Sequence, residues 1–244
     1  MSDRLSGKTC VVTGGGTGIG LGIAEAFARE GCRVLIAGRR TEALEAAKRQ
    51  IKADHPVIWR QVDVSDPASV DTLFAWAREE FERIDILVNA AGINVRRRSM
   101  AELDPADLQQ MMQINAVGAF YCMRAVLPEM RTRGDGLIVN ISSVAGLRGS
   151  VLGGVGYSMS KFALTALGQT VAREEGAHGI RVTNIYPGEV DTPMLNERPV
   201  PVSAERRAQI MQPVDVADAV LMVACLPPRA HVPDLVIKPT THDF

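Results

Sequence analysis

The chain is poor in aromatic residues, carries almost no net charge and contains no long apolar run. Only 5% of its 244 residues are Phe, Trp or Tyr, and 27 basic side chains balance 28 acidic ones. Balanced charge provides no bulk field that would draw the protein onto nucleic acid or an anionic membrane. No stretch of about 18 apolar residues is present, and the opening MSDRLSGKT contains no apolar signal region. We therefore expect a cytoplasmic protein that binds a small molecule rather than nucleic acid or membrane.

Cysteine is also scarce, and its spacing is informative. Cys10, Cys32, Cys122 and Cys225 are far apart and form no Cys-x-x-Cys pair. Three of them lie in apolar stretches, where a free cysteine behaves as a small hydrophobic residue. We expect reduced core cysteines, and no metal site is predicted.

Short apolar, β-branched runs alternate with longer amphipathic segments along the chain. Six runs are apolar nearly throughout, as in parallel strands covered on both faces. The chain is long enough for one large domain and short for two. The pattern predicts an α/β fold in one domain spanning residues 1–244, a doubly wound parallel sheet of about seven strands with helices on both faces. The runs are residues 9–14, 32–38, 57–64, 84–92, 136–143 and 180–188, with residues 234–240 as a possible edge strand.

A glycine-rich turn follows the first apolar run. The segment TGGGTGIG, residues 13–20, places Gly14, Gly18 and Gly20 between the first strand and the first helix. Glycine lets the backbone approach a pyrophosphate closely, and a helix N-terminus supplies unpaired N–H groups and a positive dipole end. Glycines also close strand-to-helix turns that bind nothing, but a position in a βαβ unit favours a dinucleotide.

The end of the second strand is expected to select the cofactor. NAD is usually held by a carboxylate about 20 residues after the glycines, which binds the ribose hydroxyls. Here Gly38 stands in that position and is followed by Arg39 and Arg40. Guanidinium groups suit a 2′-phosphate, so the pattern favours NADP(H) over NAD(H). The alternative is that the arginines only begin a solvent-exposed helix, and Thr17 leaves it open because a basic residue there would have strengthened a phosphate site.

These motifs, together with five others, resemble the short-chain dehydrogenase/reductase family. TGGGTGIG is similar to the family's Thr-Gly-x-x-x-Gly-x-Gly turn, and YSMSK at residues 157–161 is similar to its Tyr-x-x-x-Lys. The resemblance runs from about residue 7 to residue 223 and implies a Rossmann-like dinucleotide-binding oxidoreductase domain. The other matching motifs, in the family's order, are DV at 63–64, NAAG at 89–92, Asn115, Ser143 and PGEVDT at 187–192.

The resemblance implies an active site of Asn115, Ser143, Tyr157 and Lys161. In it, Tyr157 is the general acid/base, Lys161 lowers its pKa, Ser143 stabilises the carbonyl oxygen and Asn115 holds a proton-relay water. Two of the matching residues also have a purely structural alternative, since Ser143 could cap a turn and Asp63 could cap the following helix. The implied cofactor contacts are Gly14, Thr17, Gly18, Ile19, Gly20, Arg39, Arg40, Asp63, Val64, Asn89, Ala90, Gly92, Tyr157, Lys161, Pro187, Gly188, Val190 and Thr192.

The chemistry gives the tyrosine–lysine spacing a reason. Residues four apart share a helix face, so the ammonium of Lys161 can stabilise the phenolate of Tyr157, whose pKa would otherwise be about 10. We expect an NADP(H)-dependent oxidoreductase that interconverts a small carbonyl compound and its alcohol. The alternatives are a catalytically silent dinucleotide-binding regulator, and an epimerase or dehydratase, which usually has a longer C-terminal region than follows Thr192 here.

Four further features of the sequence lie outside this pattern. The interval from Ser143 to Tyr157 is one residue longer than is commonest in the family, and the glycines between them are expected to absorb it. Residues 193–213, with four prolines, are expected to form a substrate lid. Arg96, Arg97 and Arg98 could meet a substrate anion, but such a run is more often a solvated face or a subunit contact. Two strongly apolar helices suggest a homodimer or homotetramer, as in the family.

Overall fold

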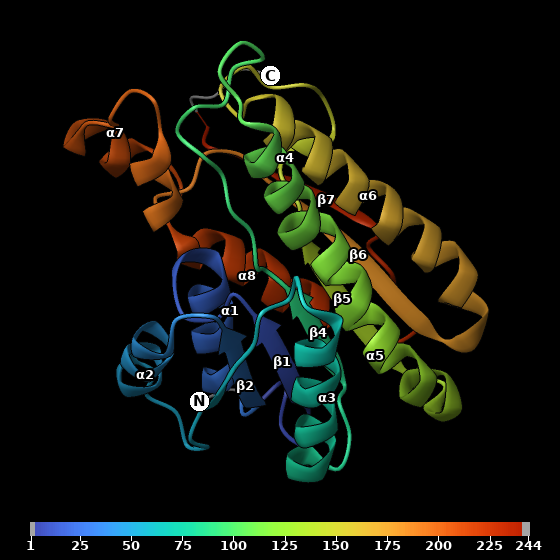
Figure 1. The fold of residues 1–244 in the computed structure, drawn as a ribbon. Coiled ribbons are helices and arrows are strands. Elements are labelled where there is room, and N and C mark those ends of the chain that lie inside the picture. Colours follow the sequence, from blue (N-terminus) through green and yellow to red (C-terminus); the bar gives the residue numbers. More distant parts are fainter. Residues whose placement is uncertain (1–2, 241–244) are drawn as a thin grey trace.

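Seven parallel strands form one sheet in the order β3-β2-β1-β4-β5-β6-β7, with helices on both faces (Figure 1). The structure is a computed structural model, and it describes residues 3–240. The predicted α/β fold is confirmed, since each of the six apolar runs contains a strand and residues 234–240 contain the edge strand. The strands are β1 (Thr9–Thr13), β2 (Arg33–Gly38), β3 (Ile58–Gln61), β4 (Ile86–Asn89), β5 (Gly136–Ile141), β6 (Ile180–Pro187) and β7 (Asp234–Ile237).

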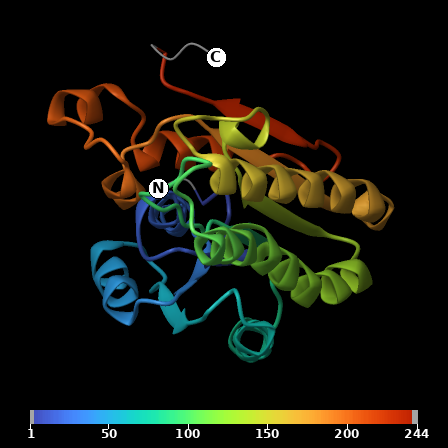
Figure 2. The same cartoon turned by 45° about the horizontal axis from the view of Figure 1, so that its top comes forward.

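The central strands are buried throughout because apolar side chains leave both of their faces. On one face, β1 residues such as Val12 pack with α1, α2 and α8. On the other face, neighbours such as Val11 pack with α3, α5 and α6. The helices are α1 (Gly18–Arg29), α2 (Thr41–Gln50), α3 (Pro67–Phe81), α4 (Pro105–Met112), α5 (Gly118–Arg133), α6 (Val155–Glu175), α7 (Ala204–Gln209) and α8 (Pro213–Ala224). In both views α5 and α6 lie side by side (Figure 2).

The strand order reverses between β1 and β4, and this positions the site. The chain proceeds from β1 outward to β2 and β3 and then returns to place β4 on the other side of β1. Loops leaving β1 and β4 therefore diverge and leave a crevice at the carboxyl edge of the sheet, where ligands of such folds bind. The loops after β5 and β6 end at the same edge.

Two irregular helical segments stand next to this edge. A π-helical turn, Gln113–Val117, joins α4 to α5 and contains Asn115. Residues 193–213 are more regular than expected, since they contain a 3₁₀ helix, η4 (Pro193–Glu197), and the short α7.

Cys10, Cys32 and Cys122 are buried and Cys225 is half-buried, and all four are free, as predicted. Among residues 3–240, no helix has the length and apolar character needed to cross a membrane. The predicted single domain spanning residues 1–244 includes residues 1–2 and 241–244, which lie outside the described part of the chain.

Candidate active site

A cavity of about 1160 Å³ lies at the carboxyl edge of the sheet and extends from the glycine-rich turn to the beginning of α6 and to η4. Most of the predicted site residues line this one cavity, although they come from distant parts of the sequence. They are Gly14, Thr17, Gly18, Ile19, Gly20, Arg39, Arg40, Val64, Ala90, Gly92, Ser143, Tyr157, Lys161, Pro187, Gly188, Val190 and Thr192. The predicted residues that lie outside its lining are Asp63, Asn89 and Asn115.

The glycine-rich turn has a backbone that other residues would not tolerate. Gly14 and Gly18 have φ angles of +70° and +56°, in the left-handed region that favours glycine. A Cβ atom at Gly20 would lie 2.4 Å from the carbonyl oxygen of Gly14. Thr17 precedes α1 and its side chain makes no capping hydrogen bond, so the first N–H groups of the helix can bind an anion. The turn fits the pyrophosphate of the predicted dinucleotide.

The end of β2 offers basic groups and room for a phosphate. Arg39 and Arg40 are exposed and line the same cavity as the turn. The guanidinium of Arg40 donates a hydrogen bond to Thr17 Oγ1 at 3.4 Å, which holds Arg40 against the turn. A Cβ atom at Gly38 would meet only Leu44 Cδ2, at 3.8 Å. A Cβ atom at residue 38 would therefore make only an ordinary van der Waals contact.

Asp63 forms a tight local turn. Its Oδ1 accepts hydrogen bonds from Ser65 N at 2.9 Å and from Ser65 Oγ at 2.6 Å. Burial alone would raise the pKa of Asp63, but the Ser65 hydrogen bonds and the charge of Arg39 lower it, and the lowering prevails. The alternative that Asp63 caps the next helix is wrong, because Asp66 caps α3 by accepting from Ala68 N.

Asn89 belongs to a row of asparagines across the sheet. Its Nδ2 donates to Asn140 Oδ1 at 3.0 Å, and Asn140 Nδ2 donates to Asn184 Oδ1 at 3.0 Å. The three residues are in register on β4, β5 and β6. Their side chains therefore link neighbouring strands beneath the cavity.

Tyr157 and Lys161 occupy the first turns of α6. Lys161 is only 4% exposed, and its Nζ donates to the carbonyl oxygen of Ile141, at the end of β5, at 2.8 Å. The same Nζ lies 5.6 Å from the centroid of the Tyr157 ring. Burial lowers the pKa of Lys161 to about 8, because a low-dielectric environment disfavours the charged ammonium.

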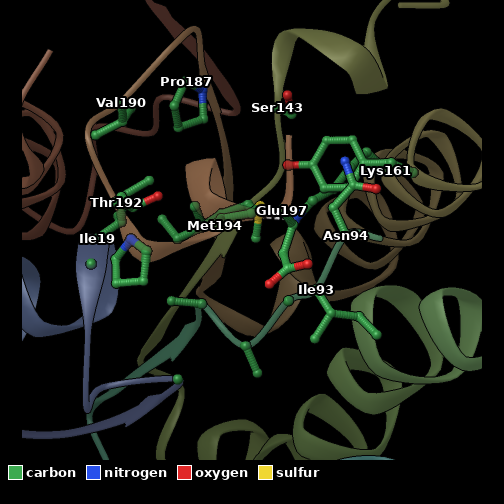
Figure 3. Close-up of a pocket in the computed structure, with 18 of the residues that line it drawn as sticks. Ile19, Ile93, Asn94, Ser143, Lys161, Pro187, Val190, Thr192, Met194 and Glu197 are labelled. Carbon is green, nitrogen blue, oxygen red and sulfur yellow. Dashed lines mark hydrogen bonds between the residues drawn. The ribbon is translucent and has the colours of Figure 1, made fainter. Parts of the chain in front are cut away.

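Several groups affect the pKa of the Tyr157 phenol. Burial raises its pKa, while a hydrogen bond with Ser143 and the charges of Arg98 and Arg198 lower it, with a net increase. Ser143 Oγ also accepts from Ala145 N at 3.1 Å, so the serine both caps a turn and faces the phenol. Figure 3 shows Ser143 and Lys161 on one side of the pocket, opposite Pro187, Val190 and Thr192.

Asn115 lies inside the π-helical turn and next to the lysine. Its Oδ1 accepts from Ile93 N at 2.8 Å, and its Nδ2 donates to Ile93 O and to Ser160 Oγ, both at 2.9 Å. A Cβ atom at Gly92 would lie 3.4 Å from Asn115 Oδ1 and 3.6 Å from Lys161 Nζ. Gly92 therefore lies next to both Asn115 and Lys161.

The extra residue between Ser143 and Tyr157 does not separate them. The interval contains a 3₁₀ turn, Val144–Gly146, and an exposed loop that ends at Gly154 with a φ angle of +83°. Val151 projects fully into solvent from this loop. The loop takes up the added length, because Ser143 and Tyr157 still line the same cavity and Ser143 lowers the pKa of the phenol.

Several cavity residues were not predicted individually. Asn94, Glu189, Met194, Glu197 and Arg198 line it, and Figure 3 shows Asn94, Met194 and Glu197 pointing into the pocket. They lie on loops or in the short η4, where no sequence periodicity indicates which side chains face inward. The sequence offered only indirect indications: Met194, Glu197 and Arg198 fall within the predicted lid, and Glu189 falls within PGEVDT. Arg98, which also lines the cavity, belongs to the arginine run.

The sequence is similar to those of known proteins. The sequence matches the model of the short chain dehydrogenase family over residues 8–201. It is 34% identical to 3alpha-hydroxysteroid dehydrogenase of Mediterraneibacter gnavus over 90% of each chain. It is also 35% identical, over 96% of its length, to glycine betaine reductase of Emericella nidulans, but it spans only 19% of that longer protein.

The fold is also similar to that of solved structures. The closed form of serine dehydrogenase complexed with NADP⁺ superimposes with a TM-score of 0.89 at 31% sequence identity. The superposition covers 97% of this chain and 96% of the other. The likeness therefore extends over the whole sheet and its helices.

Proposed function

Because the chain belongs to the short-chain dehydrogenase/reductase family, we propose that it is an NADP(H)-dependent oxidoreductase that interconverts a small carbonyl compound and its alcohol. One observation carries the proposal: a single cavity connects the glycine-rich turn to the half-buried Tyr157 and the buried Lys161. The cavity thus accommodates a dinucleotide at one end and a small substrate against the phenol at the other.

The cofactor contacts follow from this placement. The turn at Gly14, Gly18 and Gly20 would hold the pyrophosphate, and Arg39 and Arg40 the adenosine phosphate. Ala90 and Gly92 would flank the adenine ribose, and the loop from Pro187 to Thr192 would lie against the nicotinamide. When bound, the cofactor supplies or accepts the hydride, while the protein supplies orientation and electrostatics.

The protein's own residues handle the proton and the oxygen. Tyr157 would donate its phenolic proton to the carbonyl oxygen during reduction and take it back during oxidation. Ser143 Oγ accepts from Ala145 N, and its hydroxyl would donate to the substrate oxygen as negative charge develops. Lys161 is assigned to stabilise the phenolate, and Asn115 to hold a proton-relay water.

A substrate panel tests the activity. Purified protein should oxidise NADPH in the presence of at least one small aldehyde or ketone. The panel should include 3-ketosteroids and the oxidation products of β-hydroxy amino acids, because two similar proteins are dehydrogenases of a hydroxysteroid and of serine. Absence of turnover with every member, despite tight NADPH binding, would favour the catalytically silent regulator. The enzyme is favoured because positions 115, 143, 157 and 161 all carry the residue types that the reaction needs.

Replacing Arg39 with aspartate should convert the cofactor preference. The change removes a guanidinium and adds a negatively charged carboxylate, which would repel the 2′-phosphate of NADPH. The affinity for NADPH should therefore fall by about 10- to 100-fold. NADH affinity should change little, because its ribose carries hydroxyl groups there. Fluorescence titration with both cofactors measures the effect. Arg49→Asp, an equal charge change on an exposed position of α2, is the control, and equal losses of NADPH and NADH would refute the assignment.

Two further features of the predicted organisation remain proposals. We propose one domain, in which residues 193–213 cover the substrate, since Met194, Leu195, Glu197 and Arg198 line the cavity. We also propose a homodimer or homotetramer, because Phe120 of α5 and Met159 and Phe162 of α6 are large apolar residues exposed on the described surface. Sedimentation velocity tests the assembly, and a monomer at micromolar concentration would exclude it.

A further inference from the structure

Arg98 is a buried arginine whose surroundings are unusual. It is 6% exposed, yet within residues 3–240 it forms no ion pair with a carboxylate. Its guanidinium instead donates to three main-chain carbonyl oxygens, those of Val95 at 2.7 Å, Leu152 at 3.1 Å and Glu197. A buried cation retained by neutral acceptors is costly, so its position calls for a functional explanation.

The three acceptors belong to three different segments of the site. Val95 lies on the loop after β4, Leu152 on the loop before α6, and Glu197 at the last turn of η4 in the proposed lid. Carbonyl groups at the end of a helical segment have no partner within it, so a guanidinium is a favourable ligand there. Arg98 thus connects the lid to both sides of the substrate end of the cavity.

The backbone of Arg98 also supports the beginning of α6. Its carbonyl oxygen accepts from Val155 N at 3.2 Å, two residues before Tyr157. A Cβ atom at Gly154 would lie 2.6 Å from Arg98 Cβ, so the loop is packed tightly against it. Displacement of Arg98 would therefore be transmitted directly to the turn that carries Tyr157.

The lid has anchors on both sides. Arg96 donates to the carbonyl oxygen of Asn196 at 3.1 Å, adjacent to the bond from Arg98. On the opposite side, Arg198 forms an ion pair with Glu189 at 2.9 Å. The side with Arg98 is the one that is joined, through the hydrogen bond from Val155 N, to the helical turn that carries Tyr157.

We propose that Arg98 is a positioning residue for the reaction: it docks the end of η4 onto the catalytic loop and completes the cationic surroundings of Tyr157. The proposal deepens the proposed function and rests on it for the role of Tyr157. It also assigns a role to one arginine of the run Arg96–Arg98. The sequence alone allowed this run to bind a substrate anion, to face solvent or to contact another subunit.

The charges around the phenol give this arrangement an electrostatic consequence. Lys161 faces it from α6, Arg98 from the loop after β4, and Arg198 from the lid, while Glu189, Glu197 and Arg148 line the same cavity. Burial raises the pKa of Tyr157, and Arg98 and Arg198 oppose that increase. Removing the charge of Arg98 removes one opposing influence, so the phenol should titrate at higher pH.

Two substitutions of Arg98 separate its charge from its three hydrogen bonds. Arg98→Met removes both and keeps an unbranched apolar stem, while Arg98→Lys keeps the charge on a group that cannot span three carbonyls. Arg97→Met is the matched control, because its neighbour Arg97 is exposed. Each change is made in the full chain, with and without Tyr157→Phe, so that the absorbance of the Tyr157 phenolate is obtained by difference.

The expected results differ among the variants. Arg98→Met should titrate the Tyr157 phenol at higher pH than the wild type, and shift the pH dependence of alcohol oxidation the same way. Arg98→Lys should leave the titration near that of the wild type but raise KM for the carbonyl substrate at least about tenfold, and Arg97→Met should change neither. An unchanged titration and KM in Arg98→Met, or an equal shift in Arg97→Met, would overturn the proposal.

The titration of Tyr157 does not depend on turnover. If the wild type had no activity, the proposed function would be refuted, but the effect of Arg98 on the phenol could still be measured. If Arg98→Met does not fold, as judged by circular dichroism, Arg98→Lys decides the question. A raised KM with an unchanged pH profile then supports docking of the lid, and an unchanged KM refutes it.

Discussion

Replacing Tyr157 with phenylalanine should lower turnover by about 10²- to 10⁴-fold, the range that a positioned general acid contributes. The ring keeps its packing at the start of α6, and only the hydroxyl that faces Ser143 is removed. Cofactor binding should survive, since the glycine-rich turn and Arg39 lie at the other end of the cavity. Steady-state kinetics with the best substrate of the panel and fluorescence titration with NADPH measure the two quantities separately.

The appropriate control is Tyr121→Phe, because Tyr121 lies on α5 and does not line the cavity. Its turnover should equal that of the wild type. If Tyr157→Phe retained most of the activity, the phenol would not be the proton donor, and the proposed mechanism would have to be abandoned together with the role of Ser143.

Lys161 should make the stability of the fold depend on pH in a particular direction. Its pKa is about 8 in the folded protein against 10.5 for an ordinary lysine. Between these values the unfolded chain holds a proton that the folded protein has released, so the free energy of unfolding rises with pH through this window. The contribution is about 3 kcal/mol in total, and it is absent below pH 8, where both states are protonated.

Comparison with Lys161→Met isolates this contribution. Buried thiols such as Cys10 and Cys122 have raised pKa values, so they weaken the fold at alkaline pH, but they do so equally in both proteins. The wild-type free energy of unfolding, minus that of Lys161→Met, should therefore increase from pH 8 towards pH 10.5. Urea denaturation at several pH values measures it. Lys48→Met, at an exposed position, should give a flat difference, and a flat difference for Lys161→Met would contradict the lowered pKa.

A buried lysine that titrates near pH 8 also bears on catalysis. At neutral pH the ammonium is still the main form, and it is lost as the pH rises through about 8. The influences that lower the pKa of the Tyr157 phenol come from Ser143, Arg98 and Arg198. Arginine remains charged at any such pH. The arginines thus provide a positive environment that does not vanish as Lys161 loses its proton.

The local patterns in the sequence predicted the fold with few exceptions. Apolar runs indicated each strand because a parallel strand buried on both faces needs apolar residues throughout. TGGGTGIG and YSMSK were informative for a similar reason, since the conformations they require depend on residues close together in the chain. The local patterns did not indicate the short helical segments within residues 193–213, η4 and α7.

The sequence by itself therefore determined the order of strands and helices, the glycine-rich turn and the tyrosine–lysine pair, because these depend on local spacing. Only the tertiary structure decided which charges surround the phenol. Arg98 and Glu197 are 99 residues apart in the chain, and nothing in the pattern around either one indicates that they meet. Their contact depends on where loops after β4, β5 and β6 end in space, and the parallel sheet brings those ends to one edge.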